Sequence, residues 1–467
     1  MTIAANDITA RADAAATGLS GAAGATTQSC PKVTLEIGVF FDGTLNNAVN
    51  AGQGSEGSFA NARSNVALLS TLYKTNSRHW IRNSCGGYAT KYRMLYMPGI
   101  GTTDGQGDTT FPGAAMGMGS TGVEAIVYRA CLAVGAAITE LSPGIEPEEI
   151  VMDVFGFSRG AAAARYFVNC FRQGYVEYWK NYASLQRASV PKGRKVRFRF
   201  VGVFDTVAAI GLGTNERNGP VNVHMSTAQA SRIHHLTAMN EYRENFRLNH
   251  TQPGGGTTQA LPGAHSDVGG GYRNPGDEVL LERGRTSPLY GLRELADRHH
   301  QQMTDAMRRR NSATRARDEA VWISEGWLNP NETEGGVIQD PGPVRTRTQR
   351  LPGGIQQKVY SFEYGKRLSR PWVQIGLSRI PLRIMYDKAL AQGAPLLSFP
   401  GGGEFAIPSG LAAVSGKLIA GQSLNQAETR HTLRNFGHVS ANAGTIGMSA
   451  ESNHVRVVYP NQPGQAK

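Results

Sequence analysis

A glycine-serine-glycine turn between a strand and a helix constrains the fold of this chain more than any other feature. The one GxSxG sequence is GFSRG at residues 156–160. Before it, the apolar run EIVMDVF at residues 149–155 predicts a buried strand, and after it an alanine-rich segment predicts a helix. A sharp strand-to-helix turn of this kind is a nucleophile elbow. We therefore expect Ser158 to be a nucleophile, with Gly156 and Gly160 leaving room for the turn.

Strands and helices alternate along the first half of the chain. Apolar runs predict further strands at residues 33–41, 92–98 and 196–204, and helical periodicity predicts helices at 65–73, 123–141 and 159–171. This alternation is typical of α/β proteins, whose sites lie beyond the carboxyl ends of parallel strands. We predict an α/β-hydrolase with a mostly parallel central sheet and an accessory cap or membrane-docking lobe.

Changes of composition suggest where the parts of the chain begin and end. We expect a flexible N-terminal arm at residues 1–30, a catalytic core at 31–310, a cap or accessory lobe at 311–450, and a C-terminal strand and tail at 451–467. Thr286-Ser287-Pro288 predicts a helix start, because proline suits the first helical position, and the helix should run to about Arg310. Val455 to Tyr459 is the last strand candidate.

A serine nucleophile needs a base, and the base needs an orienting carboxylate. In an α/β-hydrolase the acid and then the histidine follow the serine. Asp205 closes the strand at 196–204, and His265 lies in a loop bounded by glycines, so we expect Ser158, Asp205 and His265 to form the triad.

Other residues compete for these roles. His438 is a rival base, while the pairs His234-His235 and His299-His300 lie in sequence that predicts helices at the surface. Asp267 is the rival acid: it could orient the loop, hold His265 or bind a metal, and the loop role is favoured.

The tetrahedral intermediate of acyl transfer needs two or more N–H donors. The amide of Arg159 is the expected first donor, because it directly follows the nucleophile. The turn Asp42-Gly43-Thr44 after the first strand is the expected source of the second, with the amide of Gly43 the best candidate. Asp42 could alternatively serve only to cap this turn.

Several classes of protein are disfavoured by the sequence. No stretch approaches 18 consecutive apolar residues, and the N-terminus lacks a basic and an apolar region, so we expect neither a transmembrane helix nor a secretory signal. The four cysteines have no CxxC spacing, which argues against zinc, and no metal or cofactor is expected. The net charge of +12 favours an acidic partner, but no nucleic-acid-binding motif is present.

Five motifs in order give the sequence a resemblance to a known family. They are FDGTLNN at residues 41–47, PGIGT at 98–102, GFSRGAAAAR at 156–165, VFDTV at 203–207 and GAHSDVGGGY at 263–272, with a weaker match at 380–389. The sequence resembles the type VI secretion lipase effectors of family 1, within a larger uncharacterised α/β-hydrolase family.

This resemblance implies a phospholipase A1 or A2 that hydrolyses membrane phospholipids with the triad Ser158, Asp205 and His265. It also implies secretion from the cytoplasm, without a signal peptide, by the type VI machine, through a spike or adaptor component. The effector would then act at the membrane of a rival bacterium, from its periplasm, while a cognate immunity protein protects the producer. The +12 charge suits a protein that acts on an anionic lipid surface.

Alternatives remain open at this point, since a fold does not determine a substrate. The chain could be a soluble serine esterase, thioesterase or acyltransferase, or a binding module with an inactive triad. Residues 396–450 could likewise form a mobile apolar flap, in which Phe399 and Phe405 flank three glycines, or an ordinary packed loop.

Overall fold

Six parallel strands form the central sheet of the computed structural model, in the order β2-β1-β3-β6-β7-β9. Their bounds are β1 Val33–Phe41, β2 Ala89–Met97, β3 Glu149–Phe157, β6 Val196–Phe204, β7 Arg232–Ala238 and β9 Thr257–Leu261. The structure describes residues 33–75, 89–109, 117–180, 184–191, 195–210, 221–273, 278–352, 354–442, 448–451 and 454–462. The expected N-terminal arm at 1–30 lies outside these residues.

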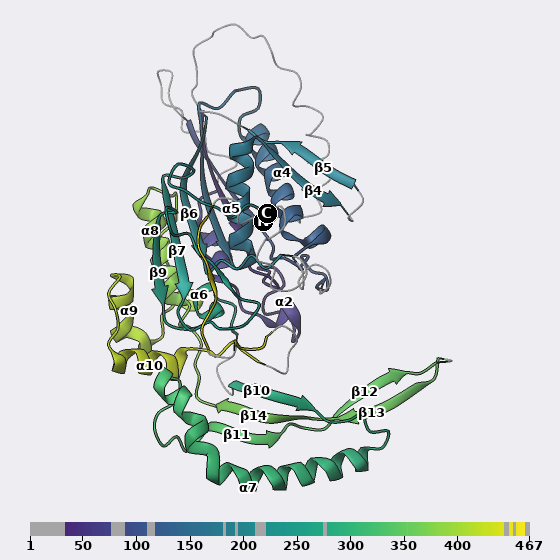
Figure 1. Ribbon diagram of the computed structural model, residues 1–467. Coiled ribbons are helices and arrows are strands. Elements are labelled where there is room, and N and C mark those ends of the chain that lie inside the picture. The colour runs from purple at the N-terminus through teal and green to yellow at the C-terminus, as the bar shows by residue number, and fades with distance from the viewer. Residues whose placement is uncertain are drawn as a thin grey trace.

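Helices cover both faces of the sheet (Figure 1). One face packs against α4 (Val123–Leu141) and α5 (Arg159–Gln173), and the other against α3 (Asn65–Leu72) and α8 (Arg379–Ala391). Successive side chains of a strand point to opposite faces. In β1, Phe41 therefore joins the core beside α4 and α5, whereas Phe40 joins the core beside α3 and α8.

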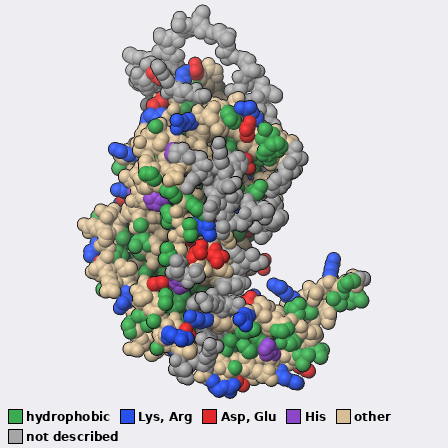
Figure 2. All heavy atoms as spheres, viewed as in Figure 1, with side chains coloured by type: hydrophobic (Ala, Val, Ile, Leu, Met, Phe, Trp, Pro, Cys, Tyr) green, Lys and Arg blue, Asp and Glu red, His purple; other side chains and the backbone are tan. Residues whose placement is uncertain are grey.

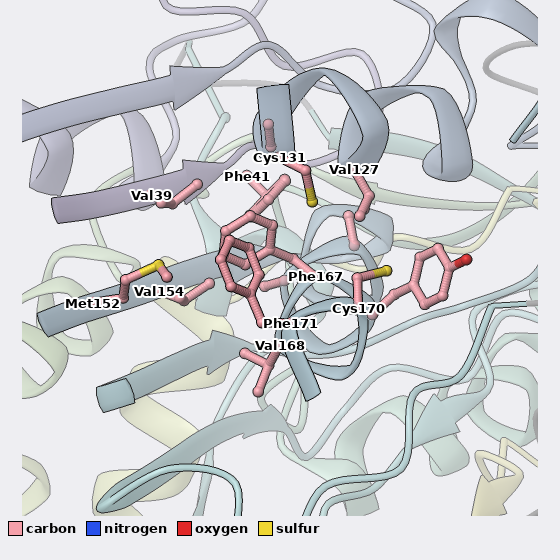
Figure 3. Close-up of a cluster of buried hydrophobic side chains, with 14 of the residues drawn as sticks. Val39, Phe41, Val127, Cys131, Met152, Val154, Phe167, Val168, Cys170 and Phe171 are labelled. Carbon is pink, nitrogen blue, oxygen red and sulfur yellow. The ribbon is translucent and has the colours of Figure 1, made fainter. Parts of the chain in front are cut away.

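The core on the α4 and α5 side is continuous and fully apolar (Figure 3). Val39, Met152 and Val154 rise from the strands to meet Phe167 and Phe171 of α5. Burial on both faces explains why β1 and β3 are mostly apolar along their length rather than strictly alternating. The α/β fold predicted from the sequence is confirmed, and the central sheet of the described residues is wholly parallel.

An accessory lobe is inserted between the core sheet and α8. It holds the antiparallel sheet β10-β14-β11, the hairpin β12–β13 and the long helix α7. Their bounds are β10 Glu278–Thr286, α7 Arg293–Glu325, β11 Gly336–Pro341, β12 Arg345–Arg350, β13 Gln356–Ser361 and β14 Glu363–Arg370. Figure 1 shows the lobe below the end of the core at which α2 and α6 lie, with β12 and β13 extending outward as an arm.

The remaining elements are short and lie around the core. They are α2 Gly57–Ala60, β4 Tyr175–Lys180, β5 Ser184–Ser189, β8 Leu248–Asn249, α6 His265–Gly269, α9 Ala412–Ile419, α10 Gln426–Phe436 and β15 Val458–Tyr459, with 3-10 turns at Gly119–Thr121, Gly403–Phe405 and Ser409–Leu411. The C-terminal strand β15 pairs in parallel with β8. None of the described helices is both long and apolar enough to cross a bilayer.

Two expectations about the second half of the chain are wrong. Thr286 ends a strand instead of starting a helix, because residues 278–286 pair with β14, and the backbone N–H of Ser287 donates to Phe362. The helix begins at Arg293 and continues to Glu325. The domain boundary expected at residue 311 therefore falls inside a continuous helix, and the lobe begins earlier, at β10.

The other differences concern side-chain environment. His234 and His235 were expected on a surface helix, but both are buried in β7. Phe399 and Phe405, the candidates for a mobile flap, contact each other edge to face and pack against the core on the α8 side. This packing favours the alternative of an ordinary packed loop.

Candidate active site

The turn between β3 and α5 has the geometry of a nucleophile elbow. Ser158 has φ 58° and ψ −127°, a strained conformation for a residue with a side chain. Its backbone N–H donates to the carbonyl of Phe204 (3.1 Å), which ties the elbow to the end of β6. Ser158 is thus held directly beside the residue that follows Phe204, namely Asp205.

The two glycines of the elbow leave no space for a side chain. A Cβ on Gly156 would lie 2.4 Å from the carbonyl oxygen of Gly160, and one on Gly160 would lie 2.2 Å from that of Asp42. Backbone atoms cannot move aside cheaply, so only glycine fits at either position. The same close approach sets the end of β1, with Asp42, against the elbow.

Asp205 and His265 form a buried, hydrogen-bonded pair. His265 Nδ1 lies 2.5 Å from Asp205 Oδ2, and the N–H of Ala238 donates to Asp205 Oδ1 (2.9 Å). The carboxylate can only accept, so Nδ1 carries the proton and Nε2 is left as the basic nitrogen. The imidazole lies between the rings of Phe157 (4.6 Å between centroids) and Phe246 (5.0 Å), which restrict its rotation.

Electrostatics keep this pair in the charge state that a general base requires. Burial opposes ionisation of Asp205, but the charge of Arg456 and the bond from His265 outweigh it and hold the pKa of Asp205 well below its usual range. Burial lowers the pKa of His265 more than its bond to Asp205 raises it. The imidazole is therefore neutral at pH 7 and able to accept a proton.

Arg456 is a site residue that sequence reasoning missed. Its Nη1 and Nη2 donate to the two carboxylate oxygens of Asp205 (2.7 and 2.9 Å), and its Nε donates to the carbonyl of Phe246 (2.6 Å). This bidentate bond and the bond from His265 together fix the orientation of the Asp205 carboxylate. Arg456 is 251 residues from Asp205 in the sequence, and no local motif marks it.

Replacing Arg456 should change the pH dependence of activity as well as the rate. With Arg456→Met we expect kcat/KM to fall ~10- to 100-fold, because Asp205 keeps fewer restraints. Loss of a nearby positive charge also raises the pKa of His265. Because activity disappears as pH falls through that pKa, the acid limb of the pH–rate profile should move up by about one pH unit. Arg456→Lys keeps the positive charge but loses the bidentate hydrogen bond to Asp205. It should therefore lower kcat/KM without shifting the acid limb of the pH–rate profile.

Tyr459→Phe is the matched control, because it loosens the same C-terminal segment without touching the triad. It removes the hydroxyl that accepts a hydrogen bond from Arg247 (2.8 Å). We expect a small loss of thermal stability and an unchanged pH–rate profile. An Arg456→Met enzyme with the profile of the native protein would show that Arg456 only supports the fold.

Glu241 also supports the histidine, and no local motif marks it. Its Oε2 accepts from the backbone N–H of His265 (3.2 Å), and both of its oxygens bind the guanidinium of Arg243. Burial opposes ionisation of Glu241, but Arg243 outweighs it and lowers the pKa of Glu241 to about 2. A second buried ion pair thus anchors the start of α6.

Asp267 and His438 form a separate pair. Asp267 accepts from His438 Nδ1 (2.8 Å) through one oxygen, and from the backbone N–H of His438 (2.8 Å) and of Ala264 (2.9 Å) through the other. The ring of His438 stacks on Tyr272 (3.8 Å between centroids). This geometry matches the favoured loop role of Asp267 and directs His438 away from Asp205.

The turn after β1 is organised by Asp42. Its carboxylate accepts from Ser64 (2.6 Å), Tyr96 (2.5 Å) and the N–H of Gly43 (2.7 Å). Burial raises the pKa of Asp42 to about 6 against the effect of these bonds. The amide expected to serve as second oxyanion donor is thus already bonded, while the neighbouring Thr44 has an enclosed hydroxyl without a hydrogen-bond partner.

No cluster of three or more histidine, cysteine or carboxylate side chains that could hold a metal occurs among the described residues. Cys131 and Cys170 are buried free thiols, as expected for small apolar residues.

Comparison with known proteins gives a family match over part of the chain and a shared fold. Residues 172–303 match the family model described as "T6SS, Phospholipase effector Tle1-like, catalytic domain". This segment contains Asp205 and His265 but not Ser158. No curated protein is significantly similar to the chain.

The solved structures that are similar to the chain include the following two. The first is the Tle1 effector bound to the VgrG spike from the Type 6 secretion system, with 24% identity, a TM-score of 0.57, and coverage of 94% of this chain and 96% of that chain. The second is an uncharacterized protein from Pseudomonas aeruginosa, with 19% identity and a TM-score of 0.43; the match covers 86% of this chain and 52% of the other.

The resemblance inferred from the five motifs is therefore confirmed, because residues 172–303 match the Tle1-like catalytic-domain model and the chain has the fold of the Tle1 effector.

Proposed function

We propose that this protein is an antibacterial type VI secretion effector that hydrolyses acyl ester bonds of membrane phospholipids. The observation that carries the proposal is the buried Asp205–His265 pair, which lies in the Tle1-like segment 172–303 and beside the strained serine elbow. The enzyme is a serine hydrolase of the phospholipase A type. Its substrates are the sn-1 or sn-2 esters of the lipid.

The proposed mechanism assigns one task to each member of the triad. Nε2 of His265 takes the proton of Ser158 as its oxygen attacks the ester carbonyl, and later delivers that proton to the departing glycerol oxygen. Asp205 holds the imidazole in the required tautomer and stabilises the imidazolium. Water then attacks the acyl-enzyme by the same route, releasing the fatty acid and regenerating Ser158.

Two groups of donors are proposed to stabilise the tetrahedral intermediate. The amide of Arg159 lies at the positive end of α5, directly after the nucleophile. The second donor comes from the turn that follows β1. The amide of Gly43 stays a prediction, and the enclosed hydroxyl of Thr44 is a further candidate beside it, because it has no other partner.

We also propose how the effector reaches its substrate. The similar Tle1 effector is bound to a VgrG spike, and this chain would be loaded onto a spike component in the same way. It would act on the membrane of the target bacterium from the periplasm, and the producing cell would need a cognate immunity protein.

Product analysis is the experiment that tests the proposed reaction. Phospholipids with a different acyl chain at each position are incubated with the native protein and with Ser158→Ala, and the released fatty acids are identified by mass spectrometry. Release of one defined fatty acid by the native protein alone supports the proposal and assigns the A1 or A2 specificity. Hydrolysis of short soluble esters without any attack on vesicles would instead favour the soluble esterase or thioesterase.

The accessory lobe is the proposed membrane-docking surface. Lysine and arginine side chains project from it (Figure 2), and β12 exposes Arg345, Arg347 and Arg350 on an arm. Each basic residue at an anionic lipid surface adds roughly 1 kcal/mol of binding free energy.

Binding to membranes should accordingly depend on salt. Association with anionic vesicles, measured by co-sedimentation, should weaken strongly from about 50 to 500 mM salt as the Debye length shortens. At low salt, replacing Arg345, Arg347 and Arg350 by glutamine should weaken the association with anionic vesicles relative to the native protein. Binding that is insensitive to salt and to lipid charge would show that apolar insertion dominates and that the +12 charge is incidental.

A further inference from the structure

The side chain of Arg159 lies against two loops that border the active site. Arg159 is the first residue of α5, and its guanidinium packs over Gly117 and beside Ile210. A Cβ added to Gly117 would lie 3.3 Å from Arg159 Nη1 and 3.6 Å from Ile210 Cγ1. Ile210 belongs to the loop that begins at Asp205, so this guanidinium lies beside the segment that follows the candidate acid.

The charge of Arg159 has no counterion in the described part of the chain. Its Nη1 is fully enclosed and has no hydrogen-bond partner. Burial lowers its pKa to about 10, so it remains a cation at neutral pH. Enclosing a charged group without a partner is costly, and such a group in a native protein usually serves a ligand or a reaction.

Two fully buried arginines of the chain differ from Arg159, because their terminal nitrogens have partners. Arg165 donates to the carbonyls of Asn249 and His250, and Arg370 donates to the carbonyls of residues 433, 434 and 437. These side chains hold the fold together through their terminal nitrogens. Among the described arginines, Arg159 is the one whose terminal nitrogen is enclosed and has no partner.

We propose that the guanidinium of Arg159 binds the phosphate diester of the lipid substrate. The inference rests on the proposed phospholipase function and names the group by which phospholipids are distinguished from neutral acyl esters. Arg159 directly follows the nucleophile Ser158, so an anion held by its guanidinium lies within one arginine side-chain length of the elbow. In a phospholipid the phosphate lies only a few bonds from either acyl ester.

The chemistry of the position fits this ligand. A guanidinium presents parallel N–H groups that match two phosphate oxygens. The N-terminus of a helix is itself favourable for an anion, and Arg159 stands at that end of α5. Enclosure of Nη1 beside Gly117 and Ile210 reduces its contact with water and strengthens its attraction to an anion. Phosphate binding would thereby supply the counterion that the unoccupied site lacks.

Two short esters that differ only in the phosphate head group test the proposal. Dibutyryl phosphatidylcholine and 1,2-dibutyrin are both used as dissolved monomers, so membrane docking does not contribute. For Arg159→Met we expect the ratio of kcat/KM for the phospholipid to that for dibutyrin to fall ~10- to 100-fold, the usual effect of a charge-assisted hydrogen bond. The backbone amide of residue 159 is kept in this variant. Arg159→Lys should recover part of the ratio.

Arg172→Met is the matched control, because Arg172 is an exposed arginine in the last turn of the same helix. Its substrate ratio should equal that of the native protein. Equal losses on both esters in Arg159→Met would assign the side chain to the fold of the elbow and overturn the proposal.

Inhibition of dibutyrin hydrolysis provides a readout that does not need phospholipase activity. Glycerophosphocholine should inhibit the native protein and inhibit Arg159→Met much less, whereas equal inhibition of both would overturn the proposal. Inhibition by inorganic phosphate that depends on Arg159, with an unchanged preference between the two esters, would show a free-phosphate site and overturn the lipid assignment. If the native protein cleaves dibutyrin but no phospholipid, the proposed phospholipase function is contradicted. The inhibition experiment still tests the Arg159 site in that case, because it measures only dibutyrin hydrolysis.

Discussion

Ser158→Ala should abolish hydrolysis of phospholipid vesicles, with a loss in kcat on the order of 10³-fold or more. The loss is large because the hydroxyl of Ser158 is the proposed nucleophile, and residues 156–160 contain no other nucleophilic side chain. The measurement is the rate of fatty-acid release at saturating lipid.

The fold of this variant should be intact. The elbow is shaped by Gly156 and Gly160, whose positions admit no side chain, and not by the hydroxyl of the serine. Thermal unfolding and the far-ultraviolet circular dichroism spectrum should match those of the native protein. A Ser158→Ala protein that folds normally and turns over at a near-native rate would eliminate the serine mechanism.

His265→Ala should be as damaging as Ser158→Ala, and the double variant should be little worse than either, because the members of a triad act as a unit. Without the imidazole, the proton of Ser158 has no acceptor, and the buried carboxylate of Asp205 loses one of its donors. The measurement is kcat on the same vesicles for the two single variants and the double variant.

His438→Ala is the control for this experiment. His438 is also buried and also bonded to an aspartate, but its partner is Asp267 and its ring is stacked on Tyr272. We expect it to lose thermal stability and to keep most of its kcat. An inactive His438→Ala together with an active His265→Ala would show that the base has been assigned to the wrong histidine.

The core of the fold could be predicted because its strands are buried on both faces. β1, β3 and β6 are consequently rich in apolar residues and stand out in the sequence. The lobe lacked such a signal, since the six residues of β12 are all exposed and carry no apolar pattern. β10 also lacks a clear apolar pattern, and its last residues predict the start of a helix. Its pairing with β14 shows that it is a strand.

The histidines of β7 show how local patterns mislead about burial. His234 and His235 lie in sequence that resembles a polar helix, yet His235 is fully buried and accepts a hydrogen bond from the backbone N–H of Thr206. Burial and neighbouring charge lower the pKa of His235 well below its usual value, so it stays neutral. A buried neutral histidine is compatible with a strand inside the sheet, and only the packing of the sheet reveals that His235 is buried.

The sequence by itself determined the nucleophile elbow and the order of the candidate triad. Both depend on short-range chemistry: glycines where backbones touch, and an acid and a histidine at the ends of strands. Only the tertiary structure paired His265 with Asp205 and His438 with Asp267, and only it brought Arg456 to the carboxylate of Asp205 across 251 residues. It alone also left the guanidinium of Arg159 enclosed without a counterion. The physical reason is that ion pairing and desolvation depend on distance in space, which a linear pattern does not encode.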